Sequence, residues 1–466
     1  MGNTIVRLQS IEIKNIKNVK YGKVDISNST FKNTSYKSAD ILGVYGQNGS
    51  GKTAIIDVLF YLQQIVMGKP LDTTIADYID VESNTAEINI EYKIFEDDII
   101  YDVGYTIILK KNTDGNIFIQ REYMNCSKTI NEMRSNKTIF IDYNFDEQQN
   151  VFSPVKNYNE LVSINKELKT DLLVAKKMAE KSNTSYIFNE TNIEIFRQVV
   201  DKGYEYSKVI LAIAHFMKIN LFIINNTHSG VISANLLLPM TFKVDTESNA
   251  TAKDELAVSL MNPTVLNKKF VAMLEEIIEE INMVLVTIIP GMTIGIKNYG
   301  PQLKNDGTEA LKIELTSIRG NKVIPIRMES YGIIKIISIL NALIHAFSDY
   351  SVCLAVDELD SGIFEYMLGE LLDVFAENAK GQLVFTSHNL RALEMLNKEN
   401  IMFSTANPEN RYIHMKNIKK TNNLRDSYLR SITLGGQNET IYKETDSLSI
   451  AKAFRKAGRK LINFNY

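Results

Sequence analysis

The sequence predicts an α/β protein in which a mostly parallel core sheet is joined to an antiparallel β subdomain, and three observations lead to this fold class. A glycine-rich run at 46–53 lies between an apolar strand pattern and an apolar helical pattern. Apolar strands at 352–356 and 382–386 alternate with helical patterns, as in parallel sheets that are buried on both faces. Residues 86–122 alternate between apolar and polar side chains, which predicts antiparallel strands.

The composition is that of an ordinary globular protein. The 466 residues are 45% hydrophobic and 23% charged, and the formal net charge of -3 argues against a general polyanion binder. The two cysteines, Cys126 and Cys353, are too few for a disulfide framework or a zinc site. The sequence contains no recognisable signal peptide and no apolar span of transmembrane length. We therefore expect a cytoplasmic protein that does not enter a membrane.

Four parts are expected along the chain. Residues 1–122 and 290–405 are expected to build one core, because strand patterns of the same kind occur in both. Residues 123–289 are expected to form an inserted, mainly helical lobe, and 406–466 a basic C-terminal extension. The helices expected in the lobe are 166–181, 193–219 and 267–286.

The run at 46–53 reads G-x-x-x-x-G-K-T, a pattern that predicts a binding loop for nucleotide phosphates. Glycines let backbone N–H groups turn toward phosphate oxygens, and the following helix N-terminus adds positive partial charge. Lys52 would reach the β- and γ-phosphates, and the Thr53 hydroxyl would bind Mg²⁺. The alternative is a glycine-rich turn without a ligand. The residues expected to surround the phosphates are Gly46, Asn48, Gly49, Ser50, Gly51, Lys52 and Thr53.

Two carboxylates follow the apolar strand at 352–356. Asp357 is placed to hold Mg²⁺, directly or through water, and Glu358 to accept a proton from an attacking water. The alternative is that this pair only caps the strand, because many strands end in acidic residues. With a phosphate loop in the same chain, the sequence favours the catalytic interpretation.

Two further motifs lie near the ends of predicted strands and helices. His388 follows the strand at 382–386, and the carboxyl ends of parallel strands meet where ligands bind. His388 is therefore expected to contact the γ-phosphate or to position the water, the alternative being a structural histidine. Ser330 and Gly332 precede an apolar helix and could bind an anion, or could simply cap that helix.

These four motifs, in this order, resemble the ATP-binding-cassette type of ATPase head found in the RecF, SMC and OLD families. The resemblance implies a P-loop ATPase head that forms a head-to-head homodimer around two ATP molecules. It implies that Ser330 and Gly332 contact the partner's ATP, although the usual Leu-Ser-Gly-Gly core is absent here. It also places His388 at the family's switch histidine and Lys17, in Asn15-Ile16-Lys17-Asn18, near the phosphates.

The resemblance covers 1–122 and 290–405. The chain lacks the long coiled coil of SMC proteins, and 406–466 is too short for the TOPRIM domain of OLD proteins. Its size instead resembles the compact ATPase components of bacterial antiphage systems, including the ATPase subunit of PARIS-type systems. That resemblance implies a Mg²⁺-dependent ATPase that senses a phage-encoded trigger and controls a separate effector, such as a TOPRIM- or HNH-type nuclease.

Two other functions remain open. One is a RecF-like ATPase of DNA repair or recombination, and the other is a scaffold that binds ATP without useful turnover. Basic residues at 411–430, including Lys419 and Lys420, and at 451–460 could bind nucleic acid or an acidic protein, or form a solvated face. Gln120 is a candidate for the family's glutamine loop.

Overall fold

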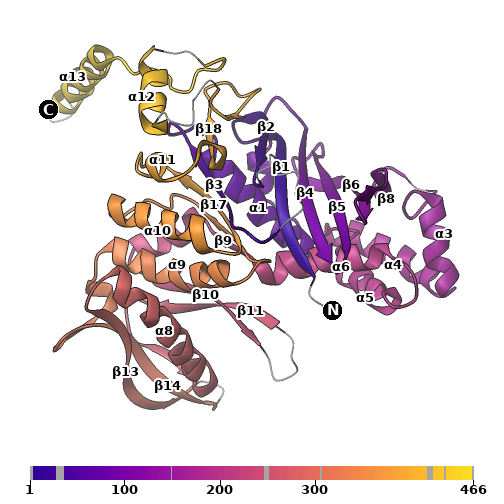
Figure 1. The fold of residues 1–466 in the computed structure, drawn as a ribbon, viewed down its shortest axis with the longest axis horizontal. Coiled ribbons are helices and arrows are strands. Elements are labelled where there is room, and N and C mark those ends of the chain that lie inside the picture. Colours follow the sequence, from indigo (N-terminus) through magenta and orange to yellow (C-terminus); the bar gives the residue numbers. More distant parts are fainter. Residues whose placement is uncertain are drawn as a thin grey trace.

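The computed structural model describes most of the chain (Figure 1). The described residues are 4–27, 36–147, 149–245, 251–304, 307–416, 423–434 and 437–463.

The centre of the molecule is a six-stranded sheet in the order β19-β18-β3-β17-β16-β9. Neighbouring strands are parallel except for β18 and β19, which are antiparallel. Because the parallel strands share one direction, their carboxyl ends lie along one edge, as the sequence predicted for β3, β16 and β17. The strands are β3 (Asp40–Tyr45), β9 (Leu221–Ile224), β16 (Cys353–Val356), β17 (Gln382–Ser387), β18 (Ile401–Ser404) and β19 (Tyr412–Ile413).

A seven-stranded antiparallel sheet lies beside this core and confirms the predicted β subdomain (Figure 1). Its order is β2-β1-β4-β5-β6-β7, with β8 also paired to β6. Along β4 every second residue is buried, which is the period of two seen in the sequence, whereas β5 also contains five consecutive buried residues. The strands are β1 (Ile5–Ile16), β2 (Val19–Asp25), β4 (Thr85–Glu96), β5 (Ile99–Lys111), β6 (Ile117–Ile130), β7 (Met133–Arg134) and β8 (Thr138–Asn144).

The core sheet separates two hydrophobic cores, because successive residues of its strands face opposite sides. Leu42 and Val44 of β3 contribute to the core shared with the antiparallel sheet, while Ile41 and Tyr45 contribute to the other. The first core is completed by α1 (Lys52–Val66), α2 (Ile75–Tyr78), α3 (Val155–Ile164), α4 (Leu168–Ser182), α5 (Glu190–Val199), α6 (Tyr206–His215) and the π-helical turn Phe216–Asn220.

The second core lies under α8, α9 and α10 and a small antiparallel sheet, β12-β14-β13 with β15 (Figure 1). The hairpin β10-β11 packs against α9 from the same side. These elements are α7 (Asn226–Ser233), β10 (Leu237–Asp245), β11 (Thr251–Ser259), β12 (Thr264–Asn267), α8 (Lys268–Ile288), β13 (Met292–Leu303), β14 (Glu309–Arg319), β15 (Lys322–Pro325), α9 (Tyr331–Ser348) and α10 (Glu365–Asn378).

The segment 123–289 is less helical than expected. Helices α4 and α8 match two of the three predicted helices, but the predicted helix at 193–219 is divided into α5 and α6. Gly203, at φ 97°, lies between them. Between 221 and 267 the lobe that was expected to be mainly helical contains four strands, and β9 is an edge strand of the core sheet itself. The apolar run of β9 was indistinguishable from a buried helix, because four residues are too few to show a period.

The sequence predicted no segment of transmembrane length, but helix α9 is long and apolar enough to reach that length. Its 18 residues have a mean hydropathy of 1.5, so by length and composition it could cross a membrane. However, 61% of this helix is buried inside the protein, as in the core helix of a globular domain. No other helix in the described part of the chain passes the same test.

The C-terminal extension begins on the core and ends away from it. Segment 437–443 lies against the loop after β18, where Ala406 N–H donates to Thr440 O at 2.7 Å. The last helix projects from the body of the molecule (Figure 1). The remaining helices are α11 (Ala392–Met395), α12 (Leu424–Leu434) and α13 (Ser447–Asn463).

Candidate functional site

The predicted phosphate loop connects β3 to α1 in a conformation that depends on glycine. Gly46, Gly49 and Gly51 have φ angles of 156°, 76° and 90°. A Cβ on Gly46 would lie 1.9 Å from Ser404 Oγ, so β18 leaves no room for a side chain there. Because left-handed backbone is costly for other residues, the glycines fix the curve that turns N–H groups inward.

Lys52 lies inside this loop, at the start of α1. Its Nζ donates to Gly46 O at 2.8 Å and to Gln47 O at 3.0 Å. Burial lowers the pKa of Lys52 to about 8, and the nearby Asp357 carboxylate opposes this shift. The Lys52 ammonium is therefore poorly solvated, and Asp357 offsets its charge only in part. A bound anion would stabilise this charge.

Asp357 follows β16 and lies beside Thr53, as the sequence predicted for a shared metal site. Its side chain is fully buried, and Thr53 Oγ1 donates to Asp357 Oδ1 at 3.3 Å. The other oxygen, Asp357 Oδ2, is buried without a hydrogen-bond partner among the described residues. A carboxylate and a hydroxyl are the hard oxygen ligands that Mg²⁺ takes beside substrate phosphates. This donor set fits Mg²⁺, and the unpartnered oxygen is available for it.

Glu358 occupies a left-handed turn directly after Asp357, with φ 49°. Its N–H donates to Thr386 Oγ1 at 2.8 Å, and the same hydroxyl lies 2.5 Å from Asp357 Oδ1. Thr386 on β17 therefore connects both acidic residues to the neighbouring strand. The Glu358 side chain is only partly buried, so water can reach it.

His388 follows β17 at the same edge of the sheet. Its N–H donates to Asp360 Oδ2 at 3.1 Å, and its side chain is exposed. Partial desolvation, and secondly the Lys52 ammonium, lower the pKa of His388. The imidazole is therefore neutral at pH 7 and can accept a hydrogen bond from water.

Ser330 caps α9, which is one of the two roles that the sequence suggested for it, the other being anion binding. Its Oγ accepts from Ile333 N–H at 3.4 Å, and the residue is exposed. Gly332 is buried against the turn after Glu358, where a Cβ would lie 1.8 Å from Gly362 O. This end of α9 shares no described hydrogen bond with the phosphate loop of its own chain.

Lys17 does not contact the loop. Its ammonium pairs with Asp57 on α1 and lies 4.4 Å from the centre of the Tyr78 ring. The neighbouring Asn18 makes the loop contact instead, because its Nδ2 donates to Gly49 O. The expected cation near the phosphates is thus already paired within the protein.

Several residues that sequence reasoning missed support the loop from the C-terminal side. Arg411 is buried and donates to Asn18 O and Thr405 O, and Tyr412 Oη donates to Gly51 O at 2.6 Å. The Gln47 side chain pairs with both backbone groups of Lys443. Apart from the bond to Thr405, these contacts join positions 361 to 396 residues apart, so no local pattern signals them.

The expected basic surface at 411–430 is interrupted. Arg411 is buried beneath the loop, and Arg425 pairs with Glu394 at 2.7 Å. Lys419 and Lys420 lie outside the described residues. Gln120, the glutamine-loop candidate, donates to Asp146 Oδ2 at 3.1 Å within the antiparallel subdomain.

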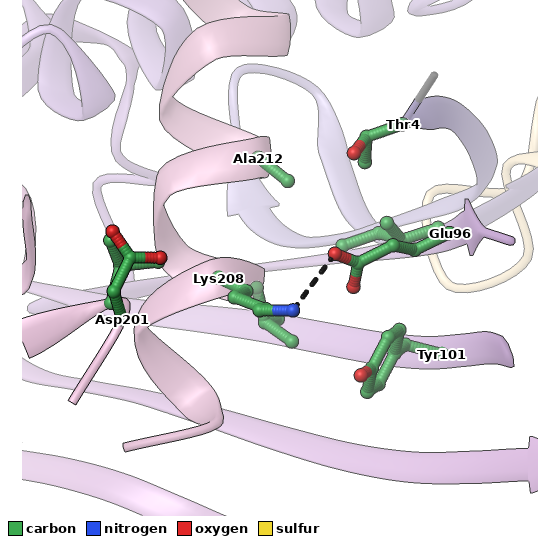
Figure 2. A pocket seen from close by; sticks show the side chains of 9 residues that line it. Thr4, Glu96, Tyr101, Asp201, Lys208 and Ala212 are labelled. Atoms are coloured by element: carbon green, nitrogen blue, oxygen red, sulfur yellow. Dashed lines mark hydrogen bonds and ion pairs between the residues drawn. The ribbon is translucent and has the colours of Figure 1, made fainter. Parts of the chain in front are cut away.

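A cavity of about 310 Å³ lies elsewhere, between β4, β5 and α6 (Figure 2). Lys208 and Glu96 form an ion pair across it at 3.1 Å, and Tyr101 lies nearby. None of its lining residues belongs to the phosphate loop.

Comparison with known proteins gives one family match. The family model described as AAA ATPase domain matches residues 7–393. No curated protein matches the chain.

Solved structures with similar folds include SMC heads and RecF. An Smc head from Pyrococcus furiosus, bound to the C-terminal domain of ScpA, is 13% identical with a TM-score of 0.38, covering 88% of this chain and 96% of that one. The SMC head of Thermotoga maritima is 9% identical with a TM-score of 0.33, covering 88% and 100%. The recombination mediator RecF with ATP is 12% identical with a TM-score of 0.32, covering 82% and 94%.

Proposed function

The chain belongs to the AAA ATPase domain family, and we propose that it binds ATP with Mg²⁺ at the phosphate loop and hydrolyses the γ-phosphate. The observation that carries this proposal is the meeting of three strand ends. The parallel strands β3, β16 and β17 bring Lys52, Asp357 and His388 to one edge, although they are distant in sequence.

The residues of this edge have separate roles in the proposed reaction. Lys52 exchanges its bonds to Gly46 O and Gln47 O for oxygens of the β- and γ-phosphates. Thr53 Oγ1 and Asp357 Oδ2 would hold Mg²⁺, which supplies charge neutralisation at the phosphates. Glu358 accepts a proton from the attacking water, and neutral His388 orients that water. The loop N–H groups hold the phosphates in line for attack.

We propose that a second copy of the chain completes each site. Ser330 is exposed at the start of α9, and large apolar side chains are exposed around it. Met328 is 67% exposed, Phe364 is 66% exposed and Tyr366 is 54% exposed. They belong to the two segments that meet at Gly332 and Gly362. Apolar side chains of this size beside an exposed anion-binding cap suit a surface that another copy covers.

The biological role we propose is control of a separate toxic effector, such as a TOPRIM- or HNH-type nuclease, in response to a phage-encoded trigger in the cytoplasm. ATP state would change the assembly, and the assembly would hold or release the effector. The exposed helix α13 offers a surface for such a partner, because its described side chains combine Phe454 with Lys452, Arg455 and Lys456.

A RecF-like role in DNA repair is the second candidate, favoured by the same basic face of α13. Capture of tagged Glu358→Gln from the native host, with and without nuclease treatment, separates the two roles. A stoichiometric protein that survives nuclease treatment supports effector control. Recovery of DNA alone, lost on nuclease treatment, supports repair. A homo-oligomer with neither would favour the ATP-bound scaffold.

A further inference from the structure

A buried lysine lies behind the acidic turn. Lys335, on α9, is only 1% exposed and is among the largest fully buried side chains of the described residues. Its Nζ donates to the carbonyl oxygen of Glu358. Burying an ammonium is costly unless the protein supplies hydrogen bonds and opposite charge. A lysine in the middle of an apolar core helix therefore requires an explanation other than packing.

The hydrogen bond from Lys335 holds Glu358, the residue proposed as the base for hydrolysis. Glu358 has φ 49°, and the left-handed conformation is unfavourable for a residue with a side chain. The turn is held at its N–H by Thr386 and at its carbonyl by Ser361 N–H at 2.9 Å. Lys335 adds the third bond, which it donates to the Glu358 carbonyl, whereas Thr386 accepts from the Glu358 N–H. Three bonds thus hold the backbone from which the Glu358 side chain extends.

Charge at the site supports the same assignment. Burial lowers the pKa of Lys335 to about 8, and the carboxylates of Asp360, Glu358 and Asp357 oppose this shift, Asp360 most strongly. Asp360 Oδ1 is itself buried without a partner among the described residues. A cation behind three acidic groups offsets part of their mutual repulsion.

The helix that carries Lys335 also carries the exposed cap. Ser330 begins α9, and Gly332 approaches the turn so closely that a Cβ would lie 1.8 Å from Gly362 O. One rigid helix therefore contacts the acidic turn at two points, through Gly332 and through Lys335. A shift of the N-terminus of α9, where the second copy is proposed to bind, would therefore displace the Glu358 turn.

We propose that Lys335 is a positioning residue, which holds the Glu358 turn through its bond to the Glu358 carbonyl and thereby links the start of α9 to the hydrolytic site. This inference rests on the proposed ATPase function. Because Lys335 is assigned no contact with ATP, its loss should lower the rate of hydrolysis without weakening ATP binding.

The test compares Lys335→Met with a matched control on the same helix. Asn341 is equally buried at 1%, but its Nδ2 donates to Glu280 Oε2 at 3.2 Å rather than to the acidic turn. Lys335→Met is expected to lower kcat about tenfold or more, because small displacements of a catalytic group are costly. Its Kd for ATP, measured by fluorescent-nucleotide displacement, should stay within about twofold of wild type. Asn341→Leu should leave both values near wild type.

The outcomes separate this inference from the proposed function. Absence of ATPase activity in the wild-type protein would remove the proposed function itself. Wild-type turnover with an unchanged kcat in folded Lys335→Met would overturn only the positioning role. Lys335→Gln, which keeps an N–H donor, provides a milder second variant if the methionine variant does not fold. Loss of folding in both would make Lys335 a purely structural residue and would also overturn the proposal.

Discussion

Thr386 Oγ1 lies 2.5 Å from Asp357 Oδ1, and this bond joins neighbouring parallel strands at the edge where the phosphate loop begins. The same hydroxyl accepts the N–H of Glu358. One side chain on β17 therefore orients both the expected metal ligand and the expected base. Outer groups of this kind are as important to a metal site as its direct ligands.

Thr386→Val should weaken the use of Mg²⁺. Valine keeps the shape of threonine but removes the hydroxyl that orients Asp357 and Glu358. We expect the Mg²⁺ concentration for half-maximal ATPase activity to rise roughly tenfold or more. Thr386→Ser keeps the hydroxyl and should remain close to wild type. Equal Mg²⁺ dependence in the valine variant and wild type would contradict this role.

Glu358→Gln should retain nucleotide binding and lose turnover. The amide is the same size as the carboxylate but cannot accept a proton from water, so a decrease in kcat of about 100-fold or more is expected. Because ATP then persists, light scattering after gel filtration should show a larger species with ATP than without it. A monomer in both conditions would argue against completion of the site by a second copy.

Gly332→Ala should destabilise the start of α9. The new methyl group would lie 1.8 Å from Gly362 O, a backbone atom that cannot move aside freely. We expect the free energy of unfolding to fall by about 1–3 kcal/mol in urea titrations. Gly230→Ala is the matched control, since nothing lies within 4 Å of its Cβ position on α7. That change should be neutral or stabilise by roughly 0.5–1 kcal/mol.

Lys253→Met should change the pH dependence of stability. Burial lowers the folded-state pKa of Lys253 to about 8, below its ordinary value of 10.5. The unfolded chain therefore binds more protons between these values, and wild-type stability gains a contribution as pH rises through that window. Methionine lacks this contribution. The difference in unfolding free energy, wild type minus variant, should increase from about pH 7 to about pH 9.5. A constant difference would show that Lys253 titrates normally.

The parts of the fold that the sequence revealed are those encoded by consecutive residues. The phosphate loop, the acidic pair after β16 and His388 after β17 each follow an apolar strand directly, so their position at one sheet edge followed from parallel pairing. The antiparallel subdomain was visible for the same reason, because its strands are long enough to show a period of two.

What the sequence did not reveal depends on contacts between distant segments. The role of Lys335 was not visible, because its partner, the backbone carbonyl of Glu358, lies 23 residues further along the chain, beyond β16. No sequence pattern indicated that Thr386, two residues before His388, would contact Asp357 and Glu358. Lys17 resembled a phosphate contact, yet Asp57 lies within reach and pairs with it. Proximity in three dimensions, which a one-dimensional pattern does not contain, decided each case.

The central position of β3 determines when the protein can fold during synthesis. Residues Asp40–Tyr45 are made early, but both strands that flank them, β17 and β18, come more than 330 residues later. Until 382–387 leaves the ribosome β3 has two unpaired edges, and one edge stays unpaired until 401–404 follows. At about 5–20 residues per second, the nascent chain spends roughly 20–70 s in that condition. Unpaired edges of this kind promote aggregation, so folding yield should depend on translation speed and chaperones more strongly than the stability of the finished protein suggests.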